Sequence, residues 1–174
     1  MNNNKIRRMA TNSMLAALCA VLGFFSIDLG NFKFTLESFP VTLGALLFGP
    51  VDGAVIAFIG NFISQLLKYG LSATTLLWIA PYVVAGLVVG LFAKAKKFEL
   101  TPVQTVMITL LAEIIITVLN TGVMYIDSKI YGYYSFAYIF GATIPRVVVC
   151  IVKGIVYGMV MPHLLKVIRK ALKL

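Results

Sequence analysis

Long apolar runs separated by short polar segments dominate the chain. A helix that spans a lipid bilayer needs about 20 largely apolar residues. The chain has six apolar runs, at residues 11–29, 39–48, 51–67, 76–93, 102–125 and 136–167. The pattern predicts an all-α integral membrane protein, in which six transmembrane helices form one compact bundle and residues 1–174 form a single domain.

Two of the runs depart from the usual length of a span. The run 39–48 is short, because Gly49-Pro50 interrupts the apolar pattern directly after it. It is expected to be a short tilted span, or one that extends back towards Thr35, unless runs two and three form a re-entrant hairpin and leave four spans. The run 136–167 is longer than a bilayer requires, so its end is expected to emerge as an amphipathic cytoplasmic tail.

The basic residues divide unevenly between the two sides that six spans would create. The N-terminus, the loop 94–97 and the C-terminal segment together hold ten, whereas the loops on the other side hold three: Lys33, Lys68 and Lys129. Cytoplasmic loops are enriched in Lys and Arg. We therefore expect a multi-pass protein of the cell membrane, with its N- and C-termini in the cytoplasm.

The composition supports a membrane environment and excludes several classes of function. Hydrophobic residues make up 60% of the chain and charged residues 12%, with a mean hydropathy of +0.97. A net charge of +9 would suit nucleic acid, but the basic residues lie between apolar runs and form no stripe, so no nucleic acid partner is expected. Cys19 and Cys150 lie in apolar runs without metal-ligand spacing, and no cofactor or metal is expected.

The chain contains no catalytic motif and no phosphate-binding loop of the G-x-x-x-x-G-K-[ST] type. It is therefore not expected to be an enzyme. Energy for active transport would have to come from a partner or from an ion gradient.

Three charged residues fall inside expected spans: Glu113, Arg146 and Lys153. A charge deep in a bilayer is costly unless it is paired or hydrated. In an antiparallel arrangement of runs five and six, Glu113 is level with Lys153, and Asn120 is level with Arg146. Glu113 and Lys153 are expected to form a structural ion pair.

Arg146 has two interpretations. Its planar guanidinium can bind both oxygens of a ligand carboxylate. Alternatively, its long side chain extends to the lipid headgroups. Pro145, directly before it, favours a fixed site at a helix bend.

Other polar and aromatic residues are expected at the same outer level. Asn61 and Gln65 are one helical turn apart in run three, and Trp78 and Tyr82 are one turn apart in run four. The aromatic pair is typical of a lipid-facing belt, or of a pocket wall that stacks on a planar ligand. Asp28 and Asp127 are expected to lie solvated in the outer loops.

Two stretches resemble a known family. Ala16-Ala17-Leu18-Cys19-Ala20 in the first run, and the stretch LGALLFGPVDGA at 43–54, are similar to segments of the substrate-binding (S) components of energy-coupling factor (ECF) vitamin transporters. The resemblance implies a high-affinity vitamin-binding subunit, driven by one transmembrane coupling subunit and two ABC ATPases. It also implies that Ala16 and Ala20 contact the coupling subunit, since small residues four apart let another helix approach closely.

Among the branches of this family, Asn120-Thr121 and Pro145-Arg146 resemble the folate members most closely, and the pantothenate members next. The loop after run three lacks the FPTGxYFPG stretch of typical folate members, so pantothenate or another small carboxylate vitamin stays open. The expected substrate-binding residues are Arg146, Asn120, Trp78, Tyr82, Asn61, Gln65, Lys33 and Tyr69. A rival interpretation is a self-sufficient ion-coupled transporter that uses Glu113 as its cation site.

The topology can be tested with single cysteines in a variant that lacks Cys19 and Cys150. The positive-inside pattern predicts that Lys129→Cys reacts with an impermeant maleimide added to intact cells, and that Lys96→Cys reacts only after the membrane is opened. If Lys96→Cys were labelled from outside and Lys129→Cys were protected, the protein would have the opposite orientation in the membrane.

Overall fold

The computed structural model describes residues 3–28 and 33–172, which are mostly helical. Lys173, one of the basic residues of the expected C-terminal segment, lies outside this part of the chain. The described elements are α1 (Asn3–Phe24), β1 (Ile27–Asp28), β2 (Lys33–Phe34), α2 (Ser38–Phe48), α3 (Pro50–Tyr69), α4 (Thr75–Ala95), α5 (Pro102–Ile130), α6 (Phe136–Phe140) and α7 (Thr143–Leu172).

Four stretches of the described chain are long and apolar enough to cross a membrane: α3, α4, α5, and α6 together with α7. Helix α1 is of similar length but has a polar and basic first half, and α2 has only 11 residues. Large apolar side chains also cover the outside of the bundle, as α7 illustrates with Ile144, Val147, Val148, Ile151, Val152 and Met159. An apolar exterior of this extent identifies an all-α membrane protein.

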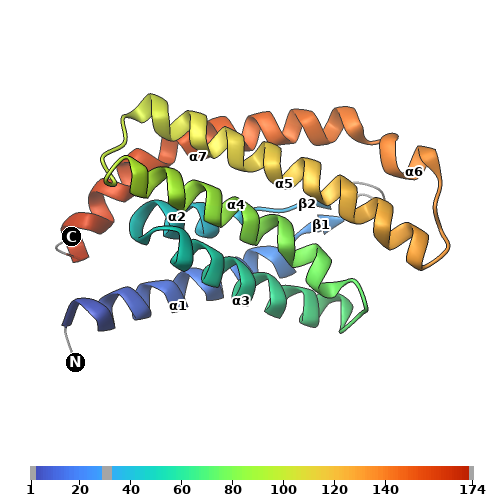
Figure 1. Cartoon of the computed structure of the whole chain (residues 1–174), viewed down its shortest axis with the longest axis horizontal. Coiled ribbons are helices and arrows are strands. Elements are labelled where there is room, and N and C mark those ends of the chain that lie inside the picture. The colour runs from blue at the N-terminus through green and yellow to red at the C-terminus, as the bar shows by residue number, and fades with distance from the viewer. Residues whose placement is uncertain (1–2, 29–32, 173–174) are drawn as a thin grey trace.

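The long helices run side by side along the longest axis of the molecule (Figure 1). Helices α1 and α3 pack together on one side, α5 and α7 on the other, and α4 contacts both α3 and α5. The start of α1, the α4–α5 loop and the end of α7 lie at one end of the bundle. The β1–β2 hairpin, the α3–α4 loop and α6 lie at the opposite end, which we call the loop end.

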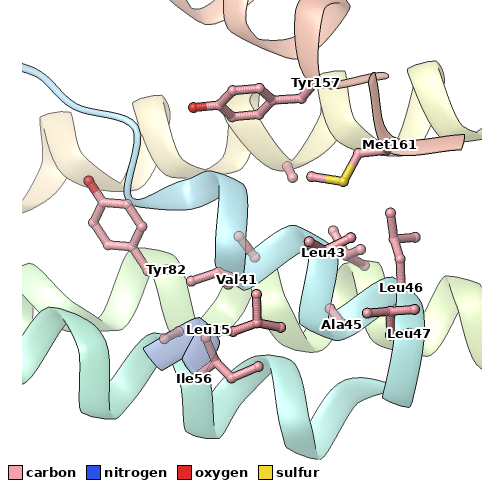
Figure 2. Packing of buried hydrophobic residues seen from close by; sticks show 14 of the residues in the cluster. Leu15, Val41, Leu43, Ala45, Leu46, Leu47, Ile56, Tyr82, Tyr157 and Met161 are labelled. Atoms are coloured by element: carbon pink, nitrogen blue, oxygen red, sulfur yellow. The ribbon is translucent and has the colours of Figure 1, made fainter. Parts of the chain in front are cut away.

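Helix α2 lies at the centre of the core, surrounded by other helices. Nine of its 11 residues are buried, so it is apolar all round and has no polar face. Leu43 and Leu46 pack among Leu15 of α1, Ile56 of α3 and Met161 of α7 (Figure 2). The short run 39–48 is therefore a helix enclosed by protein.

Local sequence signals set the ends of several helices. Gly49, with φ of 100°, separates α2 from α3, which begins at Pro50, where a missing N–H breaks no helical hydrogen bond. Helix α5 begins with a capping box, in which Thr101 and Gln104 exchange side-chain to backbone hydrogen bonds of 3.1 and 3.2 Å.

The boundaries of three expected runs were wrong. The first helix begins at Asn3. It ends at Phe24, because the chain then turns into an antiparallel hairpin that pairs Ile27 with Phe34, and Leu29, the end of the expected run, lies outside the described residues. Helix α5 continues past position 125 to Ile130. The last run is divided into α6 and α7 around Gly141, since Pro145 near the start of α7 favours a new helix there.

Glycines allow the backbones of α3 and α4 to touch. A Cβ atom added to Gly86 would lie 2.8 Å from the backbone carbonyl of Gly53, and one added to Gly90 would lie 2.3 Å from the backbone nitrogen of Pro50. Contacts with backbone atoms cannot be relieved by rotating a side chain. By contrast, a Cβ added to Gly122 in α5 would meet no atom within 4 Å.

The two kinds of glycine give a test of this packing. Gly90→Ala should lower the free energy of unfolding by about 1–3 kcal/mol, because α4 must move away from Pro50. Gly122→Ala, also inside a helix, is the matched control and should be neutral or slightly stabilising. Melting temperatures of the detergent-purified variants measure the difference. Equal melting temperatures would show that α3 and α4 do not approach this closely.

Candidate functional site

A cavity of about 550 Å³ lies between the hairpin and helices α3, α4, α5 and α7, towards the loop end. Its lining is rich in charged and aromatic side chains, although the surrounding bundle is apolar. The charged and aromatic lining residues are Asp28, Lys33, Glu37, Tyr69, Trp78, Tyr82, Glu113, Asp127, Tyr131, Tyr133, Tyr138, Arg146 and Lys153. Ligand sites typically have volumes of about 300–1,000 Å³, so the cavity is large enough for a small organic molecule.

One wall of the cavity is a polar stripe along α5. Glu113, Asn120 and Asp127 are spaced seven residues apart, which places them on one face of the helix at intervals of about 10 Å. Glu113 lies farthest from the loops, and Asp127 lies near the end of α5 that carries them. We call the region around Glu113 the inner end of the cavity.

An ion pair closes the inner end. Lys153 Nζ of α7 lies 2.8 Å from Glu113 Oε2, in the register expected from the sequence, and both side chains are buried. Thr109 Oγ1 also donates to the carbonyl of Gly154 across the same two helices, at 2.9 Å. Each charge compensates the other, which lowers the cost of placing both within the bundle.

Asp127 was expected to be solvated, and this was wrong. It is only 8% exposed, and its carboxylate accepts hydrogen bonds from Thr74 Oγ1, from Trp78 Nε1 at 3.2 Å and from the Tyr133 hydroxyl. Burial and this hydrogen bond raise the pKa of Tyr133 above its ordinary value. Through these hydrogen bonds Asp127 connects α5 to the α3–α4 loop, to α4 and to the loop before α6.

Arg146 lies on the cavity wall at the end of the first turn of α7 and is half-buried. Its Nη1 donates to the carbonyl of Ile139 in α6 at 3.1 Å, and its Nη2 lies 2.9 Å from Met124 Sδ of α5. These contacts hold the guanidinium between α5 and α6, beside the cavity.

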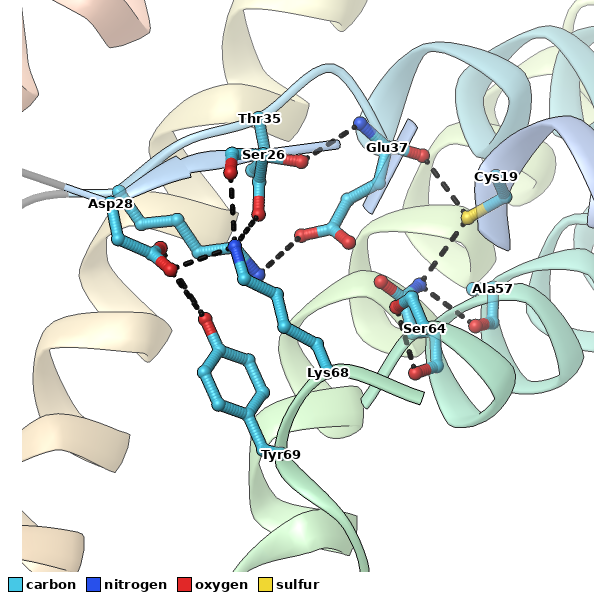
Figure 3. Close-up of polar contacts among 11 residues, drawn as sticks. Cys19, Ser26, Asp28, Thr35, Glu37, Ala57, Ser64, Lys68 and Tyr69 are labelled. Atoms are coloured by element: carbon cyan, nitrogen blue, oxygen red, sulfur yellow. Dashed lines mark hydrogen bonds and ion pairs between the residues drawn. The ribbon is translucent and has the colours of Figure 1, made fainter. Parts of the chain in front are cut away.

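Asp28 and Lys33 of the hairpin line the cavity together with Gln65 and Tyr69 of α3. Figure 3 shows the polar contacts between the hairpin and α3. Lys68 Nζ lies 2.7 Å from Asp28 Oδ2, and the Tyr69 hydroxyl donates to the same carboxylate at 3.1 Å. Asp28 is thus partly exposed but held to α3. Lys33 Nζ lies 5.5 Å from the centre of the Tyr69 ring and 3.8 Å from Glu37 Oε1.

The polar residues expected at the outer level divide into two groups. Gln65, Trp78, Tyr82 and Asn120 line the cavity. Asn61 does not line it, and its side-chain amide instead donates to the carbonyl of Ala57 at 2.8 Å in its own helix.

Glu37 was not among the expected site residues. It is 1% exposed and lines the cavity, and it precedes the buried helix α2. The available signal was a carboxylate placed directly before an apolar run. Within residues 3–28 and 33–172, no three His, Cys, Asp or Glu side chains gather as a metal site would require.

The small residues of α1 face differently from the expectation. Ala16 and Ala20 are 5% and 7% exposed, so they are buried among the helices of this chain. The cause is close packing on α3, where a Cβ added to Gly60 would lie 2.9 Å from the carbonyl oxygen of Ala16. Small residues of α1 that are exposed include Ala10, Ser13 and Ala17, and Ser13 and Ala17 are also four residues apart.

Comparison with known proteins agrees with this architecture. The chain is 33% identical over 103 residues to a UPF0397 protein of Streptococcus thermophilus, and 34% identical over 101 residues to one of Streptococcus sanguinis. Each match covers 55% of the relative, and 58% and 57% of this chain, so the chain spans about half the length of these relatives. Residues 7–165 match the family described as "ECF transporter, substrate-specific component". The chain therefore belongs to the substrate-specific components of ECF transporters.

Proposed function

We propose that this chain is the vitamin-binding subunit of an ECF importer in the cell membrane, and that its cavity holds the vitamin. One observation carries the proposal: a cavity of about 550 Å³ with a charged and aromatic lining lies towards the loop end of an apolar bundle. The start of α1, the α4–α5 loop and the end of α7 lie at the other end (Figure 1), and these segments are the basic ones, with Lys5, Lys96 and Arg169. By the positive-inside rule the cavity is on the external side, where a substrate for import arrives.

We further propose six membrane crossings, with both termini in the cytoplasm. The four long apolar stretches supply four crossings, and α1 and α2 supply the other two. Helix α2 can be short because protein surrounds it, so its ends need not reach the lipid headgroups.

Folate is the first candidate ligand and pantothenate the second. Lys33 and Arg146 provide cations for the carboxylates that both vitamins carry. The aromatic side chains of Trp78, Tyr82 and Tyr69 favour the planar ring of folate over the flexible chain of pantothenate. Riboflavin fits less well, since it has no carboxylate for Arg146.

The alternative of an ion-coupled transporter finds less support. A cation site requires a carboxylate whose charge the bound cation compensates. Lys153 already compensates Glu113 at 2.8 Å, within the protein. The energy for import is accordingly assigned to partners, one transmembrane coupling subunit and two ABC ATPases.

The exposed face of α1 is the proposed contact with the coupling subunit. Ser13 and Ala17 are exposed one helical turn apart and let a second helix approach closely in lipid. They replace Ala16 and Ala20, which pack inside the bundle.

Ligand titration of the purified protein tests the binding function. A hydrogen bond to a charged group contributes about 1.5–3 kcal/mol, so Arg146→Ala should weaken folate binding by about tenfold to a hundredfold. Arg146→Lys should also lose affinity, because an ammonium cannot bind both carboxylate oxygens. If Arg146→Ala bound folate as tightly as the wild-type protein, Arg146 would not contact the ligand. If the protein bound pantothenate more tightly than folate, the ligand would be reassigned to pantothenate, and the cavity would still be the binding site.

Coupling is tested separately from binding. Ala17→Phe should abolish uptake in cells that express the ATPase module, and should leave ligand affinity in detergent unchanged, because Ala17 lies outside the cavity. Ala16→Phe, one residue away but buried, should instead lower the yield of folded protein. Normal uptake by Ala17→Phe would place the partner on another face.

A further inference from the structure

The α5 wall of the cavity carries acceptor oxygens whose hydrogen-bonding capacity is unused. Among the described residues, Glu113 Oε1 and Asn120 Oδ1 are buried and accept no hydrogen bond. Both residues line the cavity, and Glu113 is only 2% exposed. Buried polar groups are normally paired, because an unpaired one loses its contact with water without compensation. A ligand that brings hydrogen-bond donors would satisfy both atoms.

The ion pair gives Glu113 a defined orientation. Lys153 binds Oε2 at 2.8 Å and so occupies one of the two carboxylate oxygens. The pair is neutral as a whole, so a neutral donor can bind Oε1 without adding a charge to the bundle. A carboxylate accepts hydrogen bonds only, whereas the Asn120 amide can also donate. Glu113 is therefore the group that selects the chemistry at this end of the cavity.

The walls beside Glu113 favour a flat ligand. Ile116 of α5 and Val149 of α7 are apolar, and Tyr82 of α4 contributes an aromatic ring. Apolar walls with an acceptor between them suit the edge of a planar heterocycle that carries N–H groups.

Other carboxylates of the cavity lack one of these features. Glu37 Oε2 also accepts no hydrogen bond from the described residues, but it lies over α1, where a Cβ added to Gly23 would be 2.4 Å away. Asp127 accepts from three side chains. Asp28 is occupied by Lys68 and Tyr69.

We propose that Glu113, oriented by Lys153, is a specificity-determining residue that selects ligands with an N–H-donating, planar ring edge at the inner end of the cavity. The proposal rests on the proposed function, in which this cavity is the substrate site. It also gives the ligand a defined orientation, because hydrogen-bond acceptors lie at the inner end of the cavity and the cations Lys33 and Arg146 lie nearer the loops.

Two small probes of the same ring size isolate this selection. Isocytosine presents N–H donors along its ring edge, whereas 2,4-dimethoxypyrimidine presents acceptors only. Binding of each to the detergent-purified protein is measured by saturation-transfer NMR titration. Wild-type protein should bind isocytosine about tenfold or more tightly than the dimethoxy compound.

Glu113→Gln should reverse this preference. Lys153 is a donor, so it will hold the amide oxygen of the new side chain and turn the amide NH₂ group towards the cavity. The variant should then favour 2,4-dimethoxypyrimidine. In the double variant Glu113→Gln/Lys153→Met the amide is free to rotate, and the preference should disappear. The double variant also carries no unpaired charge, which keeps the test valid if the single variant folds poorly. Glu99→Gln, in the exposed α4–α5 loop, is the matched control and should behave as wild type.

The outcomes separate this proposal from the choice of vitamin. If the preference reverses but neither folate nor pantothenate binds the wild-type protein, the role of Glu113 stands and the vitamin assignment fails. If a vitamin binds but Glu113→Gln keeps the wild-type preference, the role of Glu113 is overturned and the proposed function stands. The role of Glu113 is also overturned if the wild-type protein binds both probes equally, or binds neither of them.

Discussion

Direct contact between the backbones of α3 and α4 is the constraint on which the rest of the bundle depends. Lipid tails are as apolar as the helices, so association in a membrane relies on close packing of small residues. Gly53 and Gly86 remove the side chains that would separate α3 from α4, and Gly90 does the same opposite Pro50. The two helices then form, with α1, a unit against which α2 packs on one side.

The second unit, α5 with α7, is joined by a different combination of contacts. Gly154 and Gly158 let α7 approach α5, and the Glu113–Lys153 pair lies between the same helices. The cavity is built where this unit meets α3, α4 and the hairpin. Charged side chains can line it because each is paired or hydrogen-bonded there, and the apolar outer faces remain available to lipid.

The sequence predicted features that depend on a regular helix. The apolar runs located most of the helices, and seven-residue spacing on two antiparallel helices brought Glu113 and Lys153 to one level. Features that depend on which neighbour covers a helix face could not be predicted. Asn61 and Gln65 lie on one side of α3, yet only Gln65 reaches the cavity. Asp127 is buried by donors from Thr74, Trp78 and Tyr133, a convergence that no local pattern records.

The indole of Trp78 gives the protein an optical reporter of its own. Trp78 is the only tryptophan of the chain, it lines the cavity, and its N–H donates to Asp127. A molecule that enters the cavity changes the polarity around this single fluorophore, and any shift of the Asp127 cluster changes its hydrogen bond. When tryptophan is excited selectively over the tyrosines, the emission of the protein therefore has one source, at the site itself. Occupancy can then be followed in detergent or in vesicles without an attached dye.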